Sequence, residues 1–316
     1  MTTNLCHLTA FCKATADQQR LQVLRVLSRE SFGVMELCHI LDINQPALSH
    51  HLRILADARL VETRRQGTSI YYRRALLNAD DPLRALRASL YSTVDDMALA
   101  QDQEARKQAI YEQRHGQARQ FFKKHADRFQ ENQNLIAEYR HYAECIDGLL
   151  DSEAPGKDSL VVEIGPGESD LLENLARRFK RVIAVDNSPE MLARTRLKLG
   201  DRELKNVRLQ EGELKDVEGP IDLIILNMVL HHLASPADLF IEASQRLSSR
   251  GQLLIADLAP HDQDWTRDAC GDLWQGFDAE ELQSWAETAR LSTGQSVYLG
   301  LNNGFQVQVH LFSKNH

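Results

Sequence analysis

Residues 159–186 read SLVVEIGPGESDLLENLARRFKRVIAVD, and this stretch decides the fold of the second half of the chain. The apolar run that ends at Ile164 is typical of a buried strand, and the glycine-containing loop 165–169 then opens a helix. Glycine lets the backbone approach a ligand where a side chain would collide. A second apolar run, 181–185, ends at Asp186. The stretch therefore predicts a strand–helix–strand unit of a parallel sheet.

Two acids of this stretch predict the kind of ligand. Asp186 lies about twenty residues after the loop, where a carboxylate accepts hydrogen bonds from both ribose hydroxyls of a nucleotide, and Asn187 follows it. Glu163 stands just before Gly165 and Gly167. Its negative charge would repel a pyrophosphate but attract a sulfonium or an amino-acid ammonium. The loop thus favours a sulfonium cofactor over its rival, a nicotinamide dinucleotide.

Apolar runs and amphipathic helices continue to alternate up to the end of the chain. This alternation predicts a mostly parallel α/β sheet. We expect further strands at 207–210, 221–227 and within 246–257, a helix at 236–247, and a closing antiparallel pair near 291–299 and 305–313.

The element order, together with the loop, resembles the class I S-adenosylmethionine-dependent methyltransferases, including the quinone-type C-methyltransferases and their small-molecule relatives. The resemblance implies a Rossmann-like fold with a mostly parallel seven-stranded sheet, and S-adenosylmethionine or S-adenosylhomocysteine as the cofactor. It also implies that Glu213 meets the adenine amino group, with Gly212 and Leu214 beside it. Asn227, at the carboxyl edge of the sheet, is a candidate for holding the amino-acid part of the cofactor.

The catalytic group is less well defined by the sequence. His232 lies at the same edge of the sheet and is a candidate base, although a structural role explains this histidine equally well. The polar and aromatic insertion 257–277 suits a pocket for a small-molecule methyl acceptor but names no acceptor. Arsenic methylation is not expected, because it needs several converging thiolates and this half holds only Cys145 and Cys270.

The first part of the chain has a different pattern, with two short amphipathic helices at 34–41 and about 45–56 joined by a turn. Asn44 is a good cap for the second helix, whose leucines at 48, 52 and 55 share one face and are expected to pack on a core. The rest of the circumference offers short or polar groups to a DNA major groove, namely Gln45, Ala47, Ser49, His50 and Arg53.

A hairpin follows these helices, with strands at 60–63 and 69–73 and a turn at 64–68. Arg64, Arg65 and Thr68 of the turn are expected to contact phosphates or the minor groove. Residues 1–77 hold ten Lys/Arg and six Asp/Glu, although the whole chain has a net charge of −8. The basic charge of this quarter of the protein is therefore suited to binding a polyanion.

The stretch 36–72, ELCHILDINQPALSHHLRILADARLVETRRQGTSIYY, resembles the ArsR-type winged-helix repressors along its whole length. The resemblance implies a homodimer that reads a two-fold symmetric operator in double-stranded DNA, usually as a repressor. The alternative is a winged helix used only for protein contacts. The Cys-x-Cys pair of metal-sensing members is missing at Cys38, so no metal site is expected, and a soft-metal site of Cys6, Cys12 and Cys38 is the minor alternative.

These patterns divide the chain into a winged-helix domain at 1–80, a helical dimerisation, linker and lid region at 81–150, and a cofactor-binding domain at 151–316. An apolar stripe in the middle region is expected to pack against a second subunit or, alternatively, on its own domain; it consists of Leu83, Leu86, Leu90, Val94 and Met97. A long polar helix is expected at about 99–120. Three aromatic residues follow it, namely Phe122, Phe129 and Tyr139. They are expected either to cover the cofactor as a lid or to pack in the hydrophobic core.

Amino-acid composition indicates the cellular compartment in which this protein is expected. The five cysteines are scattered and odd in number, which favours a reducing cytoplasm. The chain shows no apolar run long enough for a membrane span and no signal-peptide pattern at its start.

Two functions follow from these patterns. The favoured one is a transcriptional regulator whose second domain senses S-adenosylmethionine or S-adenosylhomocysteine. The alternative is an active small-molecule methyltransferase with an autoregulatory DNA-binding domain.

Overall fold

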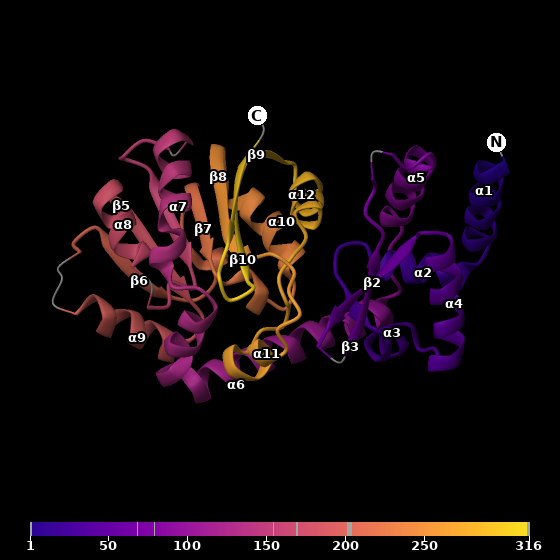
Figure 1. Ribbon diagram of the computed structural model, residues 1–316, viewed down its shortest axis with the longest axis horizontal. Helices are drawn as coiled ribbons and strands as arrows, with labels where there is room; N and C mark the ends of the chain where they lie inside the picture. The colour runs from indigo at the N-terminus through magenta and orange to yellow at the C-terminus, as the bar shows by residue number, and fades with distance from the viewer. Residues whose placement is uncertain are drawn as a thin grey trace. The chain divides into compact units, whose positions relative to one another are not determined.

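A computed structural model describes residues 2–67, 69–78, 80–153, 155–168, 170–200 and 204–314. The chain divides into two compact units, 1–113 and 114–316, and it passes from one to the other within the long helix α6 (Gln101–Ile136) (Figure 1). None of the described helices combines the length and the apolar composition that crossing a bilayer requires. The boundary between the units falls inside the region 81–150 that was expected to link the domains, so α5 (Arg84–Asp95) lies in the first unit, α7 (Tyr139–Glu153) in the second, and α6 in both.

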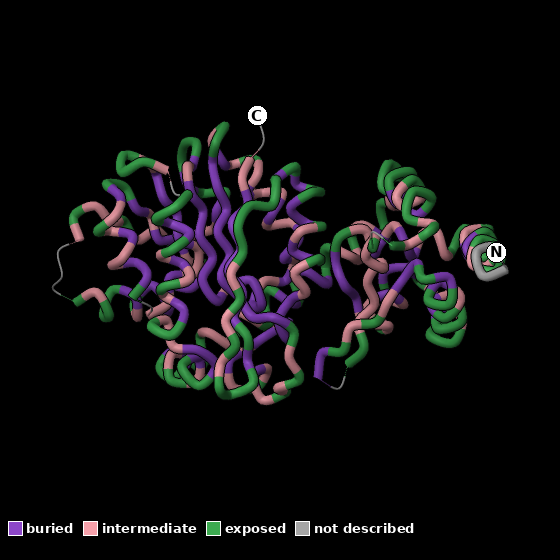
Figure 2. The backbone as a smooth tube through the Cα atoms, turned by 45° about the horizontal axis from the view of Figure 1, so that its top comes forward, coloured by how far each residue is buried: buried purple, intermediate pink, exposed green. Residues whose placement is uncertain are grey.

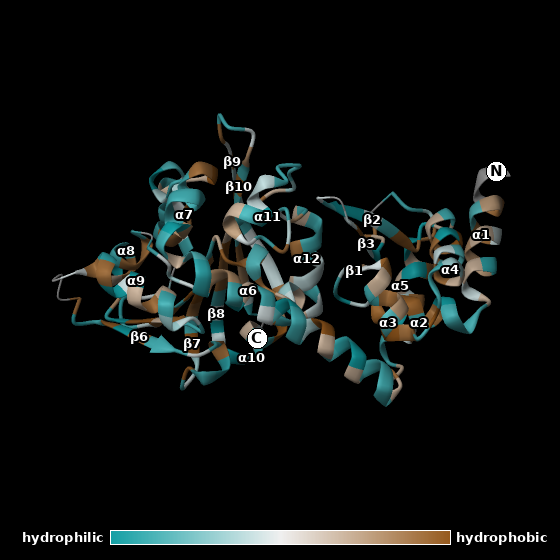
Figure 3. Cartoon of the chain, turned by 90° about the horizontal axis from the view of Figure 1, so that it is seen from below, coloured by the Kyte–Doolittle hydropathy of each residue, from teal (hydrophilic) through white to brown (hydrophobic). Residues whose placement is uncertain are grey.

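The first unit is a winged helix built from helices and a small antiparallel sheet of strand order β1-β3-β2. Its helices are α1 (Thr2–Thr15), α2 (Gln18–Val26), α3 (Val34–Leu41), α4 (Gln45–Asp57) and α5 (Arg84–Asp95). Its strands are β1 (Phe32–Gly33), β2 (Val61–Gln66) and β3 (Ser69–Arg74). Figure 3 shows the apolar residues of this unit gathered around α2 and α3.

The helix pair α3–α4 forms as the sequence predicts. Asp42 ends α3 in a left-handed conformation (φ 56°), and Asn44 then caps α4 by accepting a hydrogen bond from the amide of Ala47 (3.0 Å). Leu48, Leu52 and Leu55 are at most 1% exposed within the core of this unit. Each buried leucine contributes about 1.5–3 kcal/mol through the hydrophobic effect, so α4 is anchored by its inner face.

The apolar stripe of α5 packs mainly on its own unit. Val94 is buried in the core of the winged helix, and Leu83 and Leu90 pack against that core. Leu86 and Met97 remain 41% and 50% exposed. The described contacts thus favour the alternative that the stripe packs on its own domain. Contact of this stripe with a second subunit stays a prediction.

The second unit is built on one sheet of seven strands in the order β6-β5-β4-β7-β8-β10-β9. The first five are parallel and β10 and β9 are antiparallel, as the sequence predicts. The strands are β4 (Leu160–Ile164), β5 (Arg181–Asp186), β6 (Val207–Glu211), β7 (Ile221–Asn227), β8 (Leu247–Leu258), β9 (Leu291–Gly300) and β10 (Gln306–Lys314).

Helices cover both faces of this sheet and bury its central strands (Figure 2). One face packs against α7 (Tyr139–Glu153) and α8 (Leu171–Arg178). The other packs against α10 (Pro236–Arg246) and α12 (Ala279–Thr288), where Phe240 meets Trp285 and Phe312. The remaining elements are α9 (Pro189–Leu199), α11 (Trp265–Cys270) and the short turns η1 (Leu214–Asp216) and η2 (Leu230–His232).

Candidate cofactor and DNA-binding sites

The loop after β4 has the backbone geometry expected of a ligand-binding turn. Gly165 and Gly167 have φ of 62° and 54°, in the left-handed region that favours glycine. A Cβ at position 165 would come within 2.8 Å of a methyl group of Val229. The loop is closed by the amide of Gly165, which donates to the carbonyl of Val185 (2.9 Å), and by the hydroxyl of Thr195, which donates to the carbonyl of Gly167 (2.8 Å).

Glu163 is the most unusual group of this loop. Its side chain is fully buried on β4, and neither carboxylate oxygen has a hydrogen-bond partner. Burial alone raises the pKa of Glu163 to about 8. A buried carboxylate without partners is costly, so this position is suited to a cation that is not part of the protein.

The ends of β5 and β6 place three further predicted residues. Burial raises the pKa of Asp186 to about 6, and the carboxylate accepts one hydrogen bond, from the amide of Ser188 (2.8 Å). Asn187 is exposed beside it. Glu213 forms an ion pair with Lys215 (2.6 Å), which lowers the pKa of Glu213.

Two residues that flank Glu213 complete this part of the predicted site. Gly212, at φ 141°, accepts no side chain without a clash with Asp216, and Leu214 is buried. Asp216 was not predicted from the sequence; it accepts a hydrogen bond from the amide of Glu213 (2.8 Å) and so shapes the turn.

Asn227 ends β7 at the same edge of the sheet and is held by a residue that the sequence did not reveal. Its side-chain oxygen accepts a hydrogen bond from the hydroxyl of Tyr142 on α7 (2.9 Å), within a fully buried contact. Met228 follows in a left-handed conformation (φ 57°), which is uncommon for a residue with a side chain. The amide of Asn227 is therefore fixed in one orientation.

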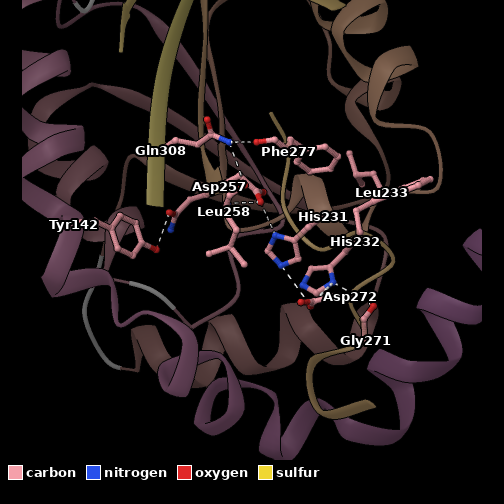
Figure 4. A network of polar contacts seen from close by, with 12 residues as sticks. Tyr142, His231, His232, Leu233, Asp257, Leu258, Gly271, Asp272, Phe277 and Gln308 are labelled. Carbon is pink, nitrogen blue, oxygen red and sulfur yellow. Dashed lines mark hydrogen bonds and ion pairs between the residues drawn. The ribbon is translucent and has the colours of Figure 1, made fainter. Parts of the chain in front are cut away.

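Asn227 pairs with Ala256 of β8, and the next residue of that strand, Asp257, belongs to a buried cluster of two histidines and two aspartates (Figure 4). The Nδ1 of His231 lies 2.7 Å from Asp257, and its Nε2 lies 3.7 Å from Asp272. The Nδ1 of His232 lies 3.7 Å from the same oxygen of Asp272. Of the four side chains, only His232 is exposed at all, by 6%.

The environment of His232 bears on its predicted role as a base. The rings of Phe122 and Phe129 of α6 pack against its imidazole, at 5.1 and 5.7 Å between ring centroids. Burial and the neighbouring His231 hold the pKa of His232 well below its ordinary value, so the ring is neutral. Tyr139, the third predicted lid residue, instead packs on Tyr142.

These features fit a cationic nucleoside. The buried carboxylate of Glu163 suits a positive charge, Asp186 offers acceptors for ribose hydroxyls, and the two glycines of the loop between them place no side chain there. When bound, S-adenosylmethionine would supply an electrophilic methyl group at this edge of the sheet. The predicted cofactor residues are thus brought to one edge by β4, β5, β6 and β7.

The outer face of α4 presents the residues predicted to read DNA. Gln45, Ser49, His50 and Arg53 are exposed and Ala47 is half-buried, opposite the anchored leucines. Arg53 and His50 are neighbours, with 3.4 Å between a guanidinium nitrogen and Nδ1. The arrangement of short and polar groups on one free helix face suits a major groove.

The wing differs from its predicted form, because the turn is shorter than expected. β2 extends to Gln66, so Arg64 and Arg65 lie within the strand and pair with Tyr71 and Ile70. Neighbouring strand residues face opposite sides, so Arg65 is exposed and Arg64 is half-buried. Arg65 also donates to the carbonyl of Gly67 (3.0 Å), while Thr68 lies outside the described residues.

The cysteines considered as a soft-metal site are not brought together in the part of the chain that the structure describes. Cys6 and Cys12 are exposed on α1 and Cys38 is half-buried on α3. The described ranges contain one group of three donors close enough to share an ion, and no cysteine belongs to it.

Sequence comparisons identify both units. A profile described as "Bacterial regulatory protein, arsR family" matches residues 17–63, and one described as "Methyltransferase domain" matches residues 162–255. An arsenical resistance operon repressor of Staphylococcus aureus is 33% identical over 79 residues, which are 25% of this chain and 76% of the repressor. A trans-aconitate 2-methyltransferase of Deinococcus radiodurans is 32% identical over 104 residues, which are 32% of this chain and 39% of that enzyme.

Structural comparison agrees with this division. The second unit is similar to magnesium protoporphyrin IX methyltransferase from Synechocystis PCC 6803, crystallised with bound SAH. The alignment includes 62% of this chain and 98% of that enzyme, with a TM-score of 0.52 and 16% identity. That likeness shows the fold of the second unit. The chain spans about half the length of several curated relatives that it matches, from 39% to 53% in three of them.

Fold and comparisons define a protein that joins a winged-helix DNA-binding domain to a class I methyltransferase domain, for which S-adenosylmethionine is the implied cofactor. The chain belongs to the ArsR family of bacterial regulatory proteins through its first unit.

Proposed function

We propose that this protein is a transcriptional repressor whose methyltransferase domain binds S-adenosylmethionine or S-adenosylhomocysteine as its signal. The observation that carries the proposal is the course of α6. Ile110 and Tyr111 of this helix are buried in the core of the winged-helix unit. Further along, Phe122 and Phe129 pack against His232, which lies in the turn η2 that follows the predicted cofactor residue Asn227 at the end of β7.

One helix thus contributes to the core of the DNA-reading unit and to the neighbourhood of the cofactor site. The crossing residue Arg114 is itself buried; it donates to the carbonyl of Ala234 (3.3 Å) and stacks on Trp274 (5.0 Å to the ring centroid). Residues 114–136 of α6 belong to the second unit. A ligand that changes the position of this segment would act on the first unit through the same helix. Such a ligand changes operator affinity only by as much as its own affinity differs between the two states.

The test measures both affinities in one cycle. Calorimetry gives the affinity for each cofactor form with and without bound DNA from upstream of the chain's own coding sequence, and fluorescence anisotropy gives DNA affinity with and without cofactor. We expect the same coupling factor in both directions, about 5- to 150-fold. Asp186→Ala, which removes the ribose acceptor, serves as the matched control and should abolish the effect at the same cofactor concentration. Equal DNA affinity with and without saturating cofactor would refute the sensor function.

The proposal extends to the assembly. We place a homodimer on a two-fold symmetric operator in double-stranded DNA, and the protein in the cytoplasm. The support is the ArsR-family winged helix, with five scattered cysteines that suit a reducing compartment. Analytical ultracentrifugation of the full chain, alone and with DNA, tests the dimer.

Active methylation of a small-molecule acceptor is the second candidate function, with DNA binding regulating the same pathway. It is favoured by the four buried polar side chains of the cluster around His231. They are not among the residues predicted to bind the cofactor, so a second role, in binding or activating a methyl acceptor, would explain them. Incubation of the full chain with methyl-labelled S-adenosylmethionine and cell extract should transfer label to a small molecule. Asp186→Ala should transfer far less, and no transfer by the unaltered protein would leave the sensor role alone.

A further inference from the structure

The cluster of His231, His232, Asp257 and Asp272 has more polar atoms than hydrogen bonds. Five of its nitrogen and oxygen atoms are buried without a partner: Nε2 of His231, Nε2 of His232, Oδ2 of Asp257 and both carboxylate oxygens of Asp272. The buried hydroxyl of Thr266 is close enough to Asp272 to influence its carboxylate, but it donates to the carbonyl of Gln263 (3.2 Å). Each unpaired buried polar atom costs free energy, so five of them at one place need an explanation.

The distances from both histidines to Asp272 are too long for hydrogen bonds and are suited to a bridging ion. The 3.7 Å separations between the histidine nitrogens and Asp272 exceed the hydrogen-bond range. One ligand atom from each of His231, His232 and Asp272 lies within 4.8 Å of the others. Ligands about 2.0–2.2 Å from a zinc ion lie roughly 3–4 Å apart, so small side-chain movements complete the site.

The hydrogen bond to Asp257 prepares His231 for this role. Asp257 accepts from Nδ1 at 2.7 Å, so the proton of the neutral ring is on Nδ1 and the lone pair of Nε2 faces Asp272. Asp257 is itself fixed by accepting a hydrogen bond from the amide of Leu258 (2.7 Å). A carboxylate behind a metal-binding histidine is the usual way to set its tautomer and orientation.

Charge balance is compatible with a divalent cation. The two carboxylates are buried together with the two histidines, and the side chains of Asp257, Asp272 and His231 are all 0% exposed. A divalent ion with both histidines neutral makes the cluster neutral. An isolated buried charge is far more costly than a compensated one.

We propose that His231, His232 and Asp272 bind one divalent transition-metal ion of the zinc type, with Asp257 orienting His231. Two imidazoles and one carboxylate are ligands that zinc accepts, and three protein ligands leave a coordination position for water or for an oxygen of a small molecule. The test of this site is separate from the test of the sensor proposal, because metal binding is measured without DNA and without cofactor.

The experiment uses the full chain with Cys6, Cys12 and Cys38 replaced by serine, so that the thiols of the first unit cannot bind metal. After treatment with chelator, the protein is titrated with Zn²⁺ and, in parallel, with Co²⁺. We expect one equivalent of each, and d–d absorption of Co²⁺ without a thiolate charge-transfer band. The absence of that band also excludes the nearby Cys270 as a ligand.

Variants then assign the ligands. Asp272→Asn and His232→Gln should each abolish binding, whereas Asp257→Asn should weaken it about 10- to 100-fold. Asp268→Asn, an exposed aspartate of the same insertion, should bind like the parent. Far-UV circular dichroism checks that each variant is folded. Failure of the parent to bind either ion, a thiolate band, or unchanged binding in folded Asp272→Asn would each overturn the proposal, whether or not the cofactor regulates DNA binding.

Discussion

Replacing Glu163 by glutamine should stabilise the cofactor-free protein at alkaline pH. The carboxyl of Glu163 is fully buried without a hydrogen bond, and burial raises its pKa from 4.5 to about 8. Between these values the folded chain keeps a proton that the unfolded chain has lost. The free energy of unfolding therefore falls as pH rises from about 4.5 to about 8, and it levels off above that range.

The size of the effect follows from the two pKa values. One pKa unit corresponds to about 1.4 kcal/mol, so Glu163 alone should remove about 3 kcal/mol of stability between pH 6 and pH 9. Glutamine has nearly the same shape and does not ionise. Glu163→Gln should lack this loss, and its advantage over the parent should grow with pH.

Urea unfolding followed by tryptophan fluorescence measures the effect in the right unit, because the chain's three tryptophans, Trp265, Trp274 and Trp285, all lie in the second unit. Glu211→Gln removes an exposed carboxylate at the end of β6 and serves as the control. Parallel loss of stability in the parent and in Glu163→Gln from pH 6 to pH 9 would refute the reasoning.

Binding of a cation at Glu163 should release the proton that burial retains. At pH 7, calorimetry in two buffers of different ionisation enthalpy should show up to about one proton released when S-adenosylmethionine binds to the parent. Glu163→Gln should release none from this position and bind the cofactor more weakly. Equal proton release by both proteins would mean that the cationic part of the cofactor lies elsewhere.

Asp186→Ala should weaken cofactor binding roughly 10- to 100-fold, because it removes charged hydrogen bonds worth about 1.5–3 kcal/mol, and unchanged affinity in calorimetry would end its assignment to the ribose. Because burial raises the pKa of Asp186 to about 6, the affinity of the parent should also fall below that pH. Replacing Arg64 and Arg65 together by alanine should lower DNA affinity and flatten its dependence on salt by about one unit of log–log slope for each arginine that binds a phosphate; an unaltered slope in anisotropy titrations would contradict the wing assignment. Leu48→Ala should destabilise the winged helix by about 2–5 kcal/mol through a cavity beneath α4, while the tryptophan-reported unfolding of the second unit stays unchanged.

The sequence was sufficient wherever structure depends on local periodicity and on single special residues. Leucines at 48, 52 and 55 recur at helical spacing, so the buried face of α4 and hence its exposed face follow directly. Asn44 was recognisable as a cap because its side chain acts on an amide three residues away. Gly165 and Gly167 and the strand-end Asp186 were recognisable for a similar reason, since a short strand–loop–helix segment fixes their positions.

The end of β2 in the wing depends on residues that are not its neighbours in sequence. The composition of 64–68 predicts a turn, yet pairing across the hairpin carries β2 through Arg64 and Arg65 to Gln66. Register depends on the partner strand, and a shift of one residue changes which side chain faces outward. The exposure of the two arginines was therefore decided by β3.

The buried polar cluster depends on tertiary structure alone. His231 meets Asp257 and Asp272 only because β7, β8 and the insertion after β8 converge at one edge of the sheet, and Asn227 meets Tyr142 from a helix 85 residues earlier in the chain. The isolation of Glu163 from any partner is likewise a property of its packed surroundings. Sequence thus determined which elements form and which residues lie at their ends, because those depend on neighbours within a few positions. The convergence of distant side chains, and with it the charge, tautomer and pKa of each group, was decided only by the packing of strands and helices that are remote in sequence.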